Sequence, residues 1–121
     1  MKQDGFNLEK SVHDIVTSAI RDFIRYYYKS EHNSDVDDLT LETLTFGALE
    51  VYSHIMQKYG KGSIIDSTII VCLAHDSKSP KETMNIETFH RLRKELNDAF
   101  ANTMAVLMET TPSYKIETND A

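Results

Sequence analysis

The chain has 121 residues, of which 40 % are hydrophobic and 26 % charged, and its formal net charge at pH 7 is -6. This composition is ordinary for a globular protein, and a net negative chain is a poor general nucleic-acid binder, because such proteins need a positive surface. We expect one folded domain over residues 1–111, a polar tail over residues 112–121, and no nucleic-acid partner.

Cysteine usage and hydropathy favour the cytoplasm. Cys72 is the only cysteine, so the chain cannot form an internal disulfide, as is usual in reducing compartments. The sequence MKQDGFNLEK at the start has no apolar region typical of a signal peptide, and no stretch approaches the roughly 18 apolar residues of a membrane span. We therefore predict a cytoplasmic protein without a membrane partner.

The first predicted helix covers about residues 8–29. Apolar residues recur at three- and four-residue spacing from Leu8 to Tyr27, which places them on one side of a helix. In the tyrosine triplet at its end, Tyr26 and Tyr27 fall on the apolar side, and Tyr28 falls on the side expected to face water. We interpret the triplet first as packing at the edge of the core.

A polar loop leads into a second predicted helix over residues 41–59. Thr40 is placed to cap its first turn, and Gly60 is placed to end it. Phe46 and Leu49 do not fit the apolar stripe of this helix. Either the helix is buried on two sides, or it exposes an aromatic side chain in an acidic setting.

Residues 64–76 form the third predicted element. Apolar residues from Ile64 to Ala74 cover every side of a helical wheel, which indicates a central buried helix with Ser63 as its cap. The β-branched side chains would also suit a strand, but the chain offers no second strand for it to pair with. We expect a helix and keep a strand as the alternative.

A last helix is predicted over residues 86–110, with an apolar stripe from Ile86 to Leu107. Just before it, Ser79-Pro80-Lys81-Glu82 carries the cap, proline and glutamate typical of a helix start. The predicted fold class is therefore all-α, a single-domain bundle of four main helices.

The strongest charge feature is an acidic window between Ser30 and Gln57, which contains no lysine and no arginine. Acidic residues around exposed aromatic side chains suit a basic protein partner, because the charges speed encounter and the aromatic side chains supply desolvated anchors. The simpler alternative is an acidic surface that keeps the protein soluble. The predicted contact residues are Tyr28, Glu31, Asp35, Asp37, Asp38, Glu42, Phe46 and Glu50.

From this window we predict a non-enzymatic binding module that neutralises a basic protein such as a toxin or a nuclease. Immunity proteins, antitoxins and anti-defence proteins are the class-level analogy. This prediction involves no cofactor and no metal. One alternative is a helical homo-oligomer that pairs through the additional apolar surface of the second and last helices.

The doublet His75-Asp76, within LAHDS at the end of the third helix, suggests an enzyme as an alternative to the binding module. It resembles the HD phosphohydrolase superfamily, whose helical enzymes hold a divalent metal with an upstream His, the His-Asp pair and a downstream Asp. The resemblance implies a metal that activates water against a phosphoester. The simpler interpretation is that the doublet only ends the helix. The implied metal ligands are His54, His75, Asp76 and Asp98.

Overall fold

The computed structural model describes residues 2–77 and 85–107, with the backbone alone for residues 2–11. No strand occurs within these residues, so the predicted all-α fold is confirmed, and residues 64–76 form a helix. A short helix over residues 101–107 follows the last main helix. The four main helices are α1 (Lys2–His32), α2 (Asp38–Tyr59), α3 (Ile64–Asp76) and α4 (Ile86–Ala99).

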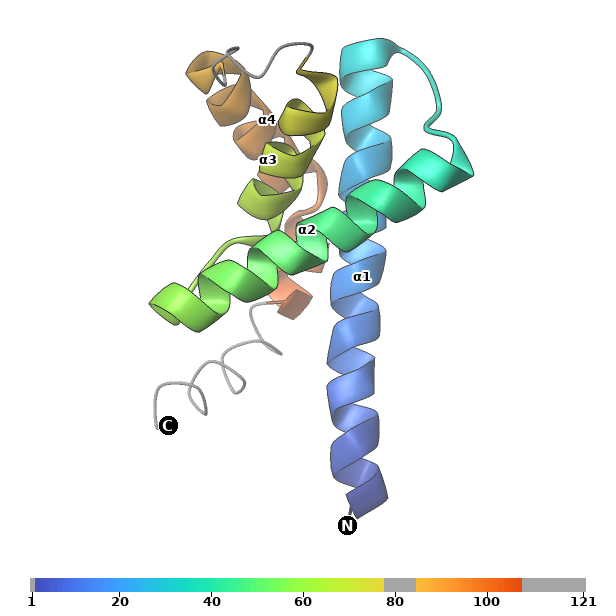
Figure 1. Cartoon of the computed structure of the whole chain (residues 1–121), viewed down its shortest axis with the longest axis vertical. Helices are drawn as coiled ribbons and strands as arrows, with labels where there is room; N and C mark the ends of the chain where they lie inside the picture. The colour runs from blue at the N-terminus through green and yellow to red at the C-terminus, as the bar shows by residue number, and fades with distance from the viewer. Residues whose placement is uncertain (1, 78–84, 108–121) are drawn as a thin grey trace.

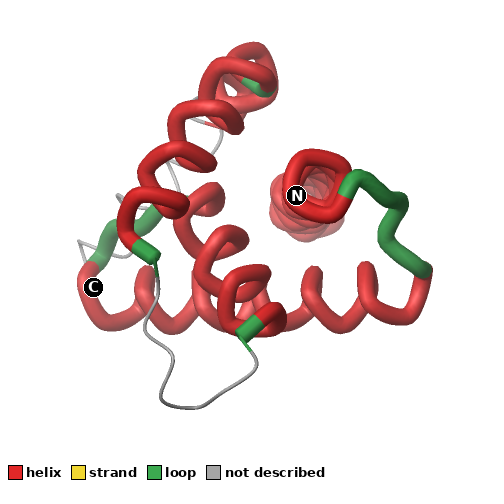
Figure 2. The backbone as a smooth tube through the Cα atoms, turned by 90° about the horizontal axis from the view of Figure 1, so that it is seen from above, coloured by secondary structure: helices red, strands yellow, loops and turns green. Residues whose placement is uncertain are grey.

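α3 is the centre of the bundle, because its buried side chains point in several directions. Ile64, Ile65, Ile69 and Cys72 are all buried, and α1, α2 and α4 each pack against this helix. Figure 2 looks along α1 and shows α3 among the other three helices. In Figure 1, α2 crosses α1, and the N-terminal part of α1 extends beyond the other helices.

Three hydroxyl groups are buried with these apolar residues, and each has a partner. Ser67 and Thr68 of α3 donate to the carbonyl oxygens four residues earlier, at 2.9 and 2.8 Å, and Thr45 of α2 does the same at 2.6 Å. A buried hydroxyl without a partner would cost stability. Within the described chain, no buried side-chain nitrogen or oxygen lacks a hydrogen-bond partner.

α2 approaches α3 closely where two small residues follow each other. Ala48 is fully buried. A β-carbon added at Gly47 would lie 3.3 Å from Cγ1 of Val71 on α3, which is tighter than ordinary van der Waals contact. The two helices therefore meet at this point with almost no space between them.

The beginnings of the helices follow from capping side chains. The carboxylate of Asp37 accepts a hydrogen bond from the backbone N–H of Thr40 at 3.2 Å, so Asp37 caps α2 and the predicted cap Thr40 lies inside the helix. Hydrogen bonds from Thr40 also lower the pKa of Asp37. Ser63 caps α3, and Gly60 ends α2 with a φ of 71°, both as predicted.

Three predicted helices have wrong bounds. α1 runs from Lys2 to His32 instead of 8–29, and its C-terminal end is longer because Glu31 and His32 still bind α4 and α3. α2 begins at Asp38 instead of residue 41, because Asp37 caps it. α4 ends at Ala99 instead of residue 110.

The physical reason for the early end of α4 lies at Phe100. The Phe100 ring packs edge-on against the rings of Phe23 and Tyr26 on α1, with centroid distances of 5.1 and 6.0 Å. The backbone leaves the helical region there, and the chain resumes as the short helix over residues 101–107.

Several sequence predictions fall on parts of the chain that lie outside the described residues. These are the start signal at residues 79–82, the end of the last helix at 108–110, and the tail at 112–121. Asn85 caps α4, through a hydrogen bond from the backbone N–H of Thr88 at 3.1 Å. Among the described helices, none combines the length and apolarity needed to cross a membrane.

Truncating a side chain of α3 should cost far more stability than the same truncation at the surface. Ile69 is 1 % exposed and Ile86 is 61 % exposed. We expect Ile69→Ala to lower the free energy of unfolding by about 2–5 kcal/mol, and Ile86→Ala to change it by about 0.5 kcal/mol or less. Urea unfolding of both variants tests this, and equal losses would contradict the central place of α3.

Cys72 should make stability fall at high pH. Burial raises the pKa of the Cys72 thiol from 9.0 to about 12. Between these pH values the unfolded chain has lost the thiol proton and the folded chain keeps it, so stability falls as pH rises, by up to about 1.4 kcal/mol per pH unit. Urea titrations at increasing pH should give a shallower fall for Cys72→Ala. Parallel curves for the two proteins would show that the thiol does not contribute.

Candidate functional site

The side of α2 opposite its buried residues carries a continuous exposed stripe. Its members alternate at spacings of four and three residues, which keeps side chains in one line along a helix. All of them are exposed. We name these residues the outer stripe of α2: Leu39, Thr43, Phe46, Glu50, Ser53 and Gln57.

Two large apolar side chains lie on this stripe. Leu39 is 77 % exposed and Phe46 is 64 % exposed, the highest values for large apolar side chains in the described part of the chain. Leu49, in contrast, is half-buried and packs against the core. Of the two alternatives for α2, the helix exposes an aromatic residue in an acidic setting.

An open depression adjoins Phe46. Its volume is about 850 Å³, and α1 contributes His13 to its lining. The remaining lining comes from α2, where Phe46, Leu49 and Ser53 supply apolar and small side chains, and Glu50 supplies a carboxylate. The surface next to the exposed ring therefore has room for side chains of another molecule.

The prediction that the acidic window is unpaired is wrong for three carboxylates. Glu31 accepts from Arg91 at 2.9 Å, Asp35 pairs with Lys29 at 3.1 Å, and Glu42 pairs with Arg21 at 2.5 Å. The basic residues come from α1 and α4, outside the sequence window, and the fold brings them to it. Exposed pairs of this kind contribute little to stability, but they reduce the local negative charge.

The rest of the window keeps its charge. Asp38 and Glu50 form no ion pair with any described residue. Asp37 is exposed, and it accepts hydrogen bonds from Thr40 at the start of α2 without a basic partner among the described residues. Negative charge thus remains at the start of α2 and beside Phe46, a smaller area than the sequence alone indicates.

Two predicted contact residues take part in the fold instead. Tyr28 does not face water as predicted: it is half-buried, burial raises its pKa, and its ring lies 4.9 Å from the ring of His32. Glu31 binds Arg91 with both carboxylate oxygens, and Arg91 also donates to Glu95 at 2.8 Å. These contacts hold the end of α1 against α4.

A second polar cluster joins the end of α1 to the end of α3. The hydroxyl of Tyr27 donates to Oδ2 of Asp76, and Nε2 of His32 lies 2.8 Å from the same oxygen. Burial, and then the hydrogen bond to Asp76, raise the pKa of Tyr27. Both partners of Asp76 come from α1, so its carboxylate connects α3 to α1.

The four residues implied by the HD resemblance are not brought together as a metal site. His54 and His75 are exposed, on α2 and α3, and Asp76 is engaged by α1. Asp98 is exposed on α4. Across residues 2–77 and 85–107, no group of three or more His, Cys, Asp or Glu side chains is arranged to hold a metal ion.

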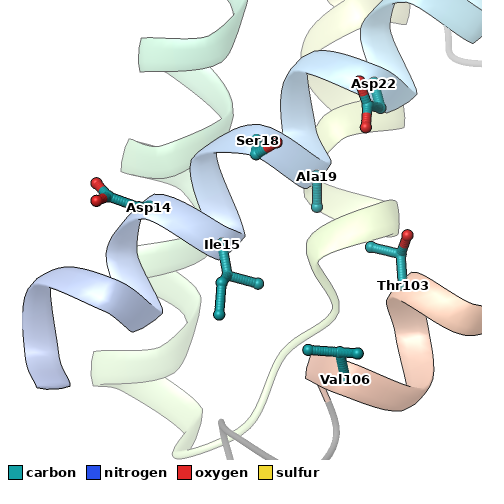
Figure 3. A pocket seen from close by; sticks show the side chains of 7 residues that line it. All are labelled: Asp14, Ile15, Ser18, Ala19, Asp22, Thr103 and Val106. Atoms are coloured by element: carbon teal, nitrogen blue, oxygen red, sulfur yellow. The ribbon is translucent and has the colours of Figure 1, made fainter.

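Sequence reasoning missed a second, smaller depression, which lies between α1 and the short helix over residues 101–107 (Figure 3). Its volume is about 380 Å³. Ile15 and Ala19 of α1 lie across from Val106, and Asp22 at its rim already pairs with Arg25 at 3.3 Å. The depression lies next to the turn at Phe100. The turn contains no glycine or proline, so the sequence gives no signal for it.

Comparison of the chain with known proteins found no similar protein. No protein-family model matches the chain, and searches of curated proteins and of solved structures return no match.

Removing the hydroxyl of Tyr27 should destabilise the fold. A hydrogen bond to a charged group contributes about 1.5–3 kcal/mol, so we expect Tyr27→Phe to lower the free energy of unfolding by roughly this amount. Tyr59→Phe is the matched control, because Tyr59 is exposed on α2. Chemical unfolding of both variants compares the two hydroxyls, and a loss for Tyr27→Phe no larger than the control would show that the bond to Asp76 adds nothing.

Proposed function

We propose that the protein is a non-enzymatic binding module that neutralises a basic partner protein, and that the outer stripe of α2 is its contact surface. The observation that carries this proposal is Phe46, an exposed phenyl ring between the carboxylates of Glu42 and Glu50. A partner that covered the Phe46 ring would remove its apolar surface from water, which is favourable for binding.

The charge around the ring indicates the chemistry of the partner. Glu50 follows Phe46 by one helical turn and has no basic partner within the described residues. Asp38 and the capping Asp37 add negative charge at the start of α2. Together with the net charge of -6, this field would attract a basic protein and repel an acidic one.

The proposed contact surface differs from the set predicted from sequence. It keeps the members on α2 except for the capping Asp37 and adds two: Leu39, whose side chain extends the apolar contact toward the start of the helix, and Ser53 next to Phe46. Asp35 and Asp37 remain as nearby charges that steer the encounter. Tyr28 and Glu31 are left out, because they pack α1 against its neighbours. The proposed contacts are Asp38, Leu39, Glu42, Phe46, Glu50 and Ser53.

The biological role that we propose is inhibition of a basic toxin or nuclease in the cytoplasm. In complexes of this type an acidic inhibitor binds a cationic surface, and the charges speed the encounter. The role rests on this analogy of chemistry.

A photo-crosslinking amino acid at position 46 tests the proposal in the source cells. We expect it to capture one basic protein, and the same amino acid at the exposed position His90 on α4 to capture none. With the captured protein purified, Phe46→Ala should weaken binding by about 30-fold, the loss of roughly 2 kcal/mol typical of an anchor residue.

Charge reversal provides the second measurement. Asp38→Lys combined with Glu50→Lys should slow association by about tenfold at low salt, because steering depends on unscreened charge. Glu87→Lys combined with Asp98→Lys, at exposed positions of α4, makes the same change in net charge away from α2. If this double variant slows association as much as the change on α2, or if position 46 captures only acidic proteins, the proposed surface is wrong.

A further inference from the structure

We infer that the part of the partner that lies on the outer stripe of α2 is a basic amphipathic α-helix. This inference rests on the proposed function and specifies the structural element that the surface accepts. Its basis is the spacing of the exposed apolar side chains, the position of the carboxylates around them, and the depression beside Phe46.

The apolar spacing matches that of a second helix. Leu39 and Phe46 are seven residues apart on one side of α2, or about 10.5 Å along the helix axis. Residues seven apart on a partner helix have the same separation, so two successive turns of that helix can contact both side chains. An extended strand repeats its side chains on one face about every 7 Å and does not keep this register.

The stripe also has the pattern of a helix-pairing seam. Its exposed members recur with the four- and three-residue spacing of paired helices, and two of the six, Leu39 and Phe46, are the apolar side chains that such pairing uses. Small Ser53 occupies the next position seven residues after Phe46. The open depression next to Phe46, about 850 Å³ in volume, leaves space for large apolar side chains of the incoming helix.

Glu50 is a member of this seam, and Glu42 lies beside it and already pairs with Arg21. Glu42 precedes Phe46 by four residues and Glu50 follows it by four, a separation of about 12 Å along the axis. In paired helices, oppositely charged residues beside the apolar contact set the choice of partner. Lysines or arginines beside the apolar side of the partner helix would meet Glu50, which has no basic partner among the described residues.

A second copy of this chain does not satisfy the same pattern. The stripe carries no basic residue, and Lys58, the last-turn base of α2, lies about 120° around the helix from Phe46. Two copies paired through their stripes would therefore place Glu50 of both chains along one seam with no basic residue on it, which is repulsive.

A designed peptide can test the inference on the full chain. The probe is a peptide of about 21 residues with leucine at the two seam positions of each heptad and lysine at the flanking positions. Its control is a scrambled peptide of the same composition, which cannot form an apolar stripe. We expect fluorescence anisotropy to show at least about tenfold tighter binding of the patterned peptide. Amide chemical shifts should change mainly on α2.

Variants of the protein connect this binding to the stripe. Phe46→Ala and Glu50→Lys should each weaken binding of the patterned peptide by about tenfold. Glu87→Lys should leave it unchanged. Circular dichroism of each variant alone checks that the helical fold is retained.

Three results would overturn the inference. Equal binding of the scrambled peptide would mean that charge alone is recognised, and the partner helix would be wrong although a basic partner remained supported. Binding that is insensitive to Phe46→Ala would place the peptide elsewhere on the protein. A dimer in light scattering that dissociates on Phe46→Ala would identify a second copy as the occupant. The proposed function fails separately, if position 46 captures no basic protein in cells.

Discussion

The structure depends on covering α3. Its apolar side chains point in several directions around the helix, so it must be surrounded, and three other helices do this. Each covering helix turns one side inward and leaves its opposite side to water. For α1 and α4 part of that remaining surface is occupied by contacts between them, including Arg91 with Glu31. For α2, the remaining surface is the outer stripe with Phe46.

The bundle uses its charged residues in two ways. Some carboxylates tie helices together: Asp66 of α3 accepts two hydrogen bonds from Arg93 of α4, at 2.8 and 3.0 Å, and Asp76 joins α3 to α1. Others, such as Glu50, have no basic partner among the described residues and face outward. Among the described residues, one of these unpaired carboxylates therefore lies beside Phe46, the most exposed aromatic ring.

Local patterns were sufficient for the fold and only partly for the site. The helix at 64–76 was predictable, because its apolar residues cover all sides of a helix and the chain offers no second strand with which a strand could pair. The end of α4 was not, since Phe100 breaks the helix through ring contacts with residues of α1 that are remote in sequence. The pair between Glu31 and Arg91 spans 60 residues, so only the folded chain reveals that this carboxylate is neutralised.

The close contact between α2 and α3 has a consequence for recognition. Gly47 lies against Val71 with little room for a larger side chain, and its neighbour Phe46 projects about 100° away from it around the helix. The backbone next to the exposed Phe46 ring is thus held in place by the close packing of α2 against α3. Little conformational entropy is then lost when a partner immobilises it, so more of the contact energy remains as affinity.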